Sequence, residues 1–230
     1  MSIGAINNPT AFSVYSNYVS SSNGLQKSMG RMSTGVKSVV DDSAGVAISE
    51  RMRSEARSTS MARNNVENGI SVLQTADSWL QRTNDMLARM HELAVEANDG
   101  TKTDADKSNI QQEFSQLQSE IARIADSAAK FNGQNLFDTT YATGKDTQVG
   151  AESGQTLKLT LANLQSSSAV DIDSGAGSVA WSQILDSTST LVTGAGNAST
   201  AITNLKKAID FVSTKRASIG GQQSRLEHTR

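Results

Sequence analysis

The chain has 230 residues, a formal net charge of −2, no cysteine and only 4% aromatic residues. This charge argues against a nucleic-acid-binding protein, which needs clustered Lys and Arg to neutralise phosphates. Without cysteine the chain has neither a disulfide framework nor a thiolate zinc site, and no apolar run is long enough for membrane insertion.

The first predicted element is an amphipathic helix over residues 11–36. Its apolar residues recur at spacings of three, four or seven: Ala11, Tyr15, Tyr18, Leu25, Met29, Met32 and Val36. Such a stripe is the face of a helix that packs on another element. The N-terminus lacks the basic region and continuous apolar region of a secretory signal, so we expect no cleavage of a usual signal peptide.

The second predicted element is a very long helix from about Ala44 to Asn98, roughly 80 Å at 1.5 Å per residue. Asp42 or Ser43 is suited to cap its start, and Asn98-Asp99-Gly100 predicts its end. It carries two adjacent apolar rows, which indicates that other helices cover a broad face. The rows are Val72, Ala76, Trp79, Met86, Met90, Leu93 and Ala97, and Leu73, Leu80, Leu87 and Ala94.

A third helix is predicted over 104–129, starting at Thr103 or Asp104, and a final helix over about 198–229. Their stripes are Ile110, Phe114, Leu117, Ile121, Ile124 and Ala128, and Ile202, Leu205, Ile209, Val212, Ile219 and Leu226. Two long helices across a short turn predict an antiparallel hairpin. We expect the interior to contain Leu73, Leu80, Leu87, Phe114, Leu117, Ile121, Ile209 and Val212.

Short strands at 147–151 and 157–164 are predicted between these helices, joined by a turn at 152–155, because Leu157, Leu159 and Leu161 alternate with other residues. Within the Ser- and Gly-rich stretch 165–199, a short helix at 179–187 should bury Trp181 and Leu185. The predicted fold class is therefore mainly α: a long antiparallel helical rod, like a coiled-coil bundle, with a small β-hairpin excursion.

Motifs for catalysis or ligand binding do not assemble in this sequence. His91-Glu92 begins like a helical zinc motif, but position 95 is Val95 where the second His is needed. There is no Gly-x-Ser-x-Gly elbow, and the Gly-Ala-Gly segments lack the strand-to-helix context of a phosphate site. We therefore predict no catalytic, cofactor or metal site, and no enzyme.

Several long segments resemble bacterial flagellin, in the order usual for that family. They are LQKSMGRMSTGVKSVVDDSAGVAISERMR at 25–53, ARNNVENGISVLQTADSWL at 62–80, ARMHELAVEAND at 88–99, FNGQNLFD at 131–138, VGAESGQTLKLTL at 149–161 and STKRASIGGQQSRLEHT at 213–229. The resemblance covers most of residues 1–164 and 200–229.

The resemblance implies a secreted structural subunit of the flagellar filament that self-assembles for motility. It also implies export by the flagellar type III apparatus with a chaperone, an inner-tube helix and spoke at 1–43, a rod at 44–165 and 200–230, and a short variable insert at 166–199. The inner-tube stripe would be Tyr15, Tyr18, Leu25, Met29 and Met32.

Family members normally continue through a C-terminal helix that pairs with the N-terminal one, and this sequence ends at Arg230. We expect that the chain lacks this inner-tube helix, as a truncated or a naturally short member. Residues 1–36 should then be mobile in the monomer, and the chain alone should give monomers or irregular aggregates rather than regular filaments.

Two alternatives stay open from the sequence. One is a junction protein between hook and filament, which would share the helical rod. The other is a soluble ligand of a host innate immune receptor, for which the resemblance gives Arg89, Leu93 and Glu113 as contacts with the receptor or within the filament. Arg89 and Glu113 could equally be solvated charges, and Leu93 a core residue.

Overall fold

The computed structural model describes residues 9–36, 42–167, 180–185 and 197–230. The chain forms two compact units, Met1–Arg57 and Ser58–Arg230. The helices are α1 (Pro9–Thr34), α2 (Ser43–Ala97), α3 (Asp104–Arg123), the π-helical η1 (Ile124–Ala128), α4 (Thr139–Ala142), α5 (Trp181–Leu185) and α6 (Asn197–Thr229). The strands are β1 (Lys130–Phe131), β2 (Gln134–Asn135), β3 (Lys145–Gln148) and β4 (Thr156–Leu159). The predicted mainly α fold with a small hairpin is confirmed.

The first unit contains α1 and the beginning of α2. After Thr34 the chain turns at Gly35, whose φ of 66° is favourable for glycine, and the Gly35 N–H donates to the carbonyl of Arg31 at 2.9 Å. Asp42 caps α2, as expected, because its Oδ1 accepts from the Gly45 N–H at 2.8 Å. No residue of α1 is buried.

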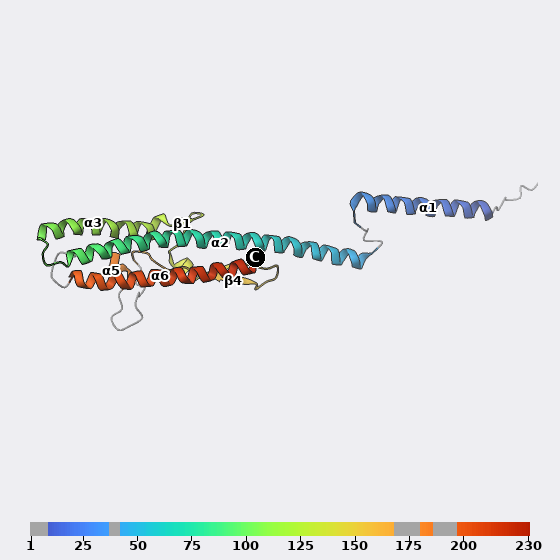
Figure 1. Ribbon diagram of the computed structural model, residues 1–230. Helices are drawn as coiled ribbons and strands as arrows, with labels where there is room; N and C mark the ends of the chain where they lie inside the picture. Colours follow the sequence, from blue (N-terminus) through green and yellow to red (C-terminus); the bar gives the residue numbers. More distant parts are fainter. Residues whose placement is uncertain (1–8, 37–41, 168–179, 186–196) are drawn as a thin grey trace, which may run out of the picture. The chain divides into compact units, whose positions relative to one another are not determined.

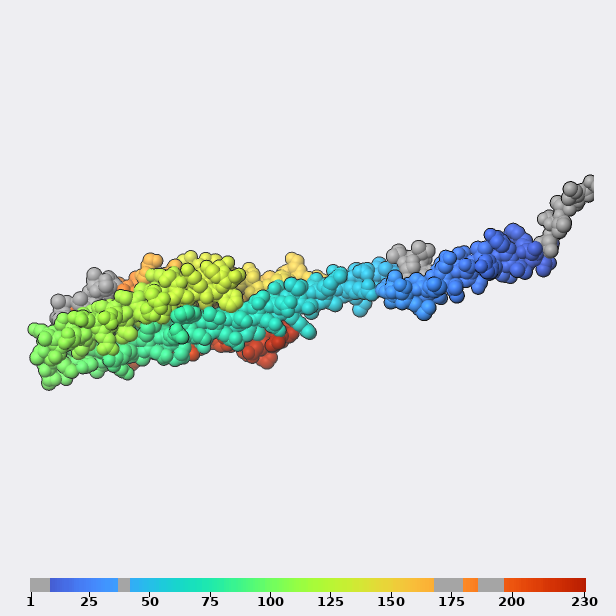
Figure 2. Space-filling view, turned by 90° about the horizontal axis from the view of Figure 1, so that it is seen from above, coloured from blue at the N-terminus to red at the C-terminus, as the bar shows by residue number. Residues whose placement is uncertain are grey.

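The second unit is built on α2, α3 and α6, which run side by side (Figure 1). Arg216 Nε of α6 lies 2.8 Å from Asp77 Oδ1 of α2, and Arg230 Nη2 lies 3.0 Å from Glu67 Oε1, so α6 runs antiparallel to α2. Figure 2 shows α3 lying along α2 after the short turn that joins them, also in the opposite direction. The predicted antiparallel helical hairpin is therefore present.

Within this unit, α2 has a regular buried seam whose members alternate by four and three residues. They are Ala62, Val66, Gly69, Leu73, Ala76, Leu80, Thr83, Leu87, Met90, Ala94 and Ala97. This spacing is that of a coiled-coil seam. A Cβ added at Gly69 would lie 3.4 Å from Leu159 Cδ1 and from Leu226 Cδ1. Leu159 of the hairpin and Leu226 of α6 therefore both pack against α2 at Gly69.

The buried faces of the other two helices differ from the prediction at two positions. Leu117 and Ile209 were expected in the interior, but both are only half-buried at its edge. Gln118 replaces Leu117 in the interior because its Nε2 donates to the Ile184 carbonyl at 2.8 Å. On α6 the seam consists of Ala198, Ala201, Leu205, Ala208, Val212, Ile219, Gln222 and Leu226, while Ile202 and Ile209 lie at its edge.

The strands are shorter than predicted, since 149–151 and 160–164 lie outside them. β3 and β4 pair antiparallel in the register Lys145↔Leu159 to Gln148↔Thr156. Beyond β4 the side chain of Gln222 takes over both backbone groups of Thr160: Oε1 accepts from its N–H and Nε2 donates to its carbonyl, each at 3.0 Å. An amide side chain thus replaces the next ladder step and ties the hairpin to α6.

The short helix α5 is buried between α3 and α6, as predicted for Trp181 and Leu185. Trp181 is 0% exposed, and its Nε1 donates to the Leu164 carbonyl at 2.7 Å. Ser166 is also fixed, because its N–H and hydroxyl donate to the carboxylate of Asp126. Most of the predicted insert 166–199, and the ends of the predicted helix 179–187, lie outside the described residues.

Candidate assembly surfaces

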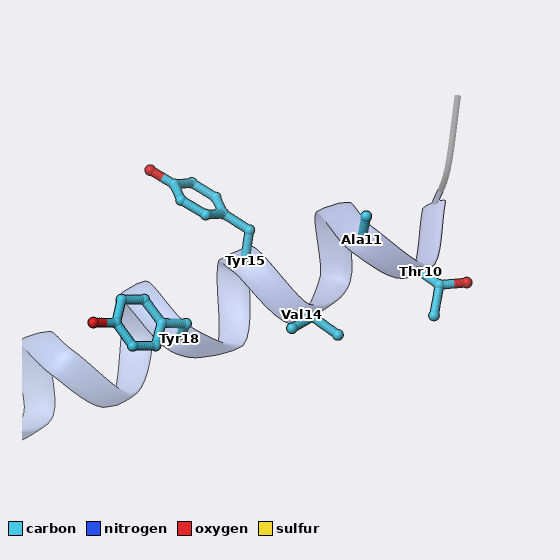
Figure 3. A pocket seen from close by; sticks show the side chains of 5 residues that line it. All are labelled: Thr10, Ala11, Val14, Tyr15 and Tyr18. Carbon is cyan, nitrogen blue, oxygen red and sulfur yellow. The ribbon is translucent and has the colours of Figure 1, made fainter. Parts of the chain in front are cut away.

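The most exposed apolar surface of the described residues lies on α1. The predicted stripe is fully accessible within the chain: Tyr15 is 67% exposed, Tyr18 71%, Leu25 64%, Met29 56% and Met32 78%. Tyr15 and Tyr18 also border a shallow hollow with Thr10, Ala11 and Val14, and all five side chains stand on α1 (Figure 3).

The exposure of this stripe is energetically unfavourable for a free helix. Burial of one large apolar side chain gains about 1.5–3 kcal/mol, and an exposed contiguous apolar patch commonly marks an interaction surface. Apolar residues at comparable spacings on α2 and α6 are buried by packing within the chain. The stripe of α1 is therefore the surface with most to gain from a partner.

A second apolar site lies at the start of α2, in the first unit. Ile48 is 50% exposed and Met52 65% exposed. They are four residues apart, so they share one face of the helix. This pair was not predicted, because the apolar rows predicted on this helix begin at Val72, although the i, i+4 spacing of Ile48 and Met52 was a usable signal.

The third candidate is a charged cluster on the surface of the second unit. Arg89 Nε of α2 donates to Glu113 Oε1 of α3 at 2.8 Å, and Arg89 Nη1 donates to Glu92 Oε2 at 3.2 Å. The bond to Glu113, followed by the bond to Glu92, raises the pKa of Arg89. The side chains of Arg89 and Glu113 are 49% and 47% exposed, so this pair contributes little to stability.

Of the three predicted contact residues, the structure brings two together at the surface. Arg89 and Glu113 bridge α2 and α3, whereas Leu93 is 1% exposed and belongs to the core. A partner that docks on the folded rod therefore meets the charged pair and not the Leu93 side chain.

In the described parts of the chain, no three or more His, Asp or Glu side chains are grouped so that they could hold a metal ion. Across the same residues, no helix has both the length and the apolar character needed to cross a membrane. The features that carry a functional argument here are surfaces.

The family model for the bacterial flagellin N-terminal helical region matches residues 6–142. The chain is also 38% identical over 206 residues to a flagellin of Halalkalibacterium halodurans, in an alignment that covers 89% of this chain and 70% of the relative. The chain belongs to the bacterial flagellin family. Members of this family are structural proteins that are exported as subunits of the flagellar filament.

Further relatives agree with this assignment. The chain is 35% identical to the flagellar filament 33 kDa core protein of Treponema phagedenis, over 89% of this chain and 72% of that protein. The crystal structure of Bacillus cereus flagellin matches with a TM-score of 0.56 and 29% identity, over 73% of this chain and 86% of the other. A putative hook-associated protein of Vibrio parahaemolyticus matches with a TM-score of 0.65 and 16% identity, over 84% and 92%, which shows a shared fold alone.

Proposed function

We propose that the chain is a structural subunit of the bacterial flagellar filament and that it joins other copies of itself through the apolar stripe of α1. One observation carries this proposal. The rod buries its own stripes on α2, α3 and α6, whereas Tyr15, Tyr18, Leu25, Met29 and Met32 stay exposed.

The roles that we propose for the segments of the chain follow from the family resemblance. Residues 1–43 would form the inner-tube helix and its connection, 44–165 and 200–230 the rod, and 166–199 the variable insert. The export apparatus of the flagellum and an export chaperone would be the partners before assembly. The exposed stripe gives a reason for a chaperone, because an uncovered apolar helix sticks to other surfaces.

A role for the charged cluster belongs to the same proposal. Arg89 and Glu113 form a fixed pair across α2 and α3 that is accessible in the free subunit. It would serve as a contact with a neighbouring subunit, or with a host innate immune receptor when subunits are released. Since Leu93 is in the core, its truncation would weaken such a contact by destabilising the rod rather than by removing a touching side chain.

The stripe can be tested by replacing apolar residues with glutamine, which is also a good helix former. The purified L25Q/M29Q variant and the wild-type chain are each mixed with sheared filament seeds from the producing bacterium. Added chain is measured by sedimentation and by electron microscopy. We expect the wild type to add to the seeds and the variant to remain in the supernatant, with an unchanged helical circular dichroism spectrum.

The matched control is S20Q/N23Q, which places two glutamines on the opposite, polar side of α1. It should add to seeds like the wild type. If L25Q/M29Q adds as well as this control, the stripe is not the assembly surface.

A further inference from the structure

The methionines of this chain fall into two environments. Among the described residues, Met29, Met32, Met52 and Met61 are 56%, 78%, 65% and 61% exposed, whereas Met90 is 0% exposed and Met86 is half-buried. The exposed ones all lie in α1 or the first third of α2. The rod interior thus protects the thioether of Met90, whereas α1 presents those of Met29 and Met32 to solvent.

We propose that Met29 and Met32 form a reversible oxidation site that controls whether the α1 stripe can assemble. The inference rests on the proposed role of this stripe. Each thioether sulfur would take one oxygen atom from a peroxide. The O–O bond breaks, the sulfur loses two electrons to become a sulfoxide, and hydrogen peroxide leaves as water. Methionine sulfoxide reductases restore the thioether with two electrons from a dithiol, which becomes a disulfide, and the oxygen leaves as water.

The two residues are placed where this change has its largest effect. Met29 and Met32 are three residues apart and lie on the same side of α1 as Leu25, so all three would be buried together by a partner. A sulfoxide is polar, and its burial without a hydrogen bond is costly. Oxidation therefore removes the apolar gain of two stripe positions and adds a desolvation cost.

Helix formation does not require methionine at these positions. Leucine and methionine have similar helix propensities, and the buried seam of α2 uses leucine at Leu73, Leu80 and Leu87. Methionine differs from leucine in its flexibility and in its oxidisable sulfur. The stripe thus has an oxidisable residue at two exposed positions where leucine would give the same helix.

The first test maps the reaction. The full chain is treated with hydrogen peroxide, and sulfoxide formation is followed at each methionine by peptide mass spectrometry. We expect Met29 and Met32 to oxidise at least about tenfold faster than Met90, which the core shields. Equal rates at Met29, Met32 and Met90 would overturn the assignment of an accessible site.

The second test measures assembly. Wild type, M29L/M32L and M52L/M61L are added to filament seeds before and after peroxide treatment. We expect peroxide to reduce addition of wild type and of M52L/M61L several-fold, and to leave M29L/M32L nearly unchanged. Treatment of oxidised wild type with methionine sulfoxide reductases and a dithiol reductant should restore addition. Retention of helical circular dichroism shows that the rod is intact.

The outcomes separate this inference from the proposed function. If untreated wild type does not add to seeds, assembly through the stripe fails, and its control by oxidation fails with it. If untreated wild type adds but peroxide has no effect, or M29L/M32L is as sensitive as wild type, the stripe remains the assembly surface and the oxidation site is overturned.

Discussion

At the scale of single residues, Leu80 of α2 and Leu25 of α1 have identical side chains in opposite environments, 0% and 64% exposed. Leu80→Ala should lower the free energy of unfolding of the rod by about 2–5 kcal/mol, because apolar contacts are lost and a cavity remains. Leu25→Ala is the matched control and should change it by less than about 0.5 kcal/mol. Urea unfolding followed by circular dichroism measures both. Equal effects would contradict the burial assigned to the two helices.

The amide of Gln222 gives a second residue-scale prediction. Gln222→Leu leaves the Thr160 N–H and carbonyl without the two hydrogen bonds that Gln222 supplies. The cost should be about 1–3 kcal/mol if these groups remain shielded from water. Gln223→Leu, at the neighbouring position outside this contact, is the control. The same unfolding measurement applies, and a Gln222 variant as stable as the Gln223 variant would show that water replaces the amide.

The burial of individual residues was predictable from sequence where the apolar repeat is regular. The rows through Leu73, Leu80 and Leu87 are buried as expected, because a four-three alternation defines one side of a helix. The prediction that Leu117 and Ile209 are fully buried was wrong, because hydrophobicity alone favours them as interior residues over Gln118 and Ala208. Gln118 is inside because the Ile184 carbonyl of α5 accepts a hydrogen bond from it, and Ala208 is inside because other elements pack over it; both reasons are tertiary.

At the scale of elements, the start of α3 depends on a reciprocal cap between Thr103 and Asp106. The Thr103 hydroxyl accepts from the Asp106 N–H, and the Asp106 carboxylate accepts from the Thr103 N–H. Hydrogen bonds from the Thr103 side chain, then from its backbone, lower the pKa of Asp106. Its folded pKa lies below the unfolded value, so the stabilisation is present above the unfolded pKa of about 3.9 and is lost as pH falls through the folded pKa.

We therefore expect the first turn of α3 to loosen on acidification in the wild type. Asp106→Asn should remove this pH dependence, while Asp104→Asn, which leaves the capping bonds intact, should keep it. Backbone NMR chemical shifts of residues 103–107, followed from about pH 6 to pH 2, report the change. A wild-type turn that is insensitive to acid would count against the cap.

Short elements were less predictable than long ones. The hairpin was expected from alternating leucines, but its strands are only four residues long. Beyond them the Val149 N–H still donates to the Gln155 carbonyl at 2.9 Å, whereas the Gln222 amide takes both backbone groups of Thr160. The small pair β1 and β2 has no periodic pattern to reveal it. It turns through Asn132 and Gly133 with φ values of 48° and 76°, for which the Asn-Gly dipeptide was the available signal.

At the scale of the whole molecule, the two units should differ in local stability. Residues 11–34 of α1 bury nothing, while the seam from Leu73 to Leu87 is enclosed by other helices. Hydrogen exchange in the monomer should therefore be fast in α1 and slow along the seam, by orders of magnitude. Strong protection of α1 in a monodisperse monomer would mean that its stripe is already covered. Protection that appears only after addition to seeds would agree with assembly.

The candidate surfaces were predictable to different degrees. The α1 stripe follows from its spacing, and its exposure follows from the absence of a matching partner among the described helices. The sequence did not show whether Leu93 is a core residue or a surface contact, because an apolar row on one helix does not reveal whether another element covers it. Proximity of Arg89 to Glu113 depends on the register of the α2–α3 hairpin, which the short turn fixes only in the folded chain.

The hydrogen bonds from Ser166 to Asp126 of η1 and from Trp181 to the Leu164 carbonyl hold the chain at two points, on either side of a stretch of sequence. Both anchors are made by groups outside that stretch, so the length of a segment inserted between them would enter the free energy of folding mainly through loop closure. Each doubling of such a loop costs only about 0.6 kcal/mol. Foreign peptides could therefore be grafted between these anchors at small thermodynamic cost, with the hydrogen bonds of Ser166 and Trp181 left in place.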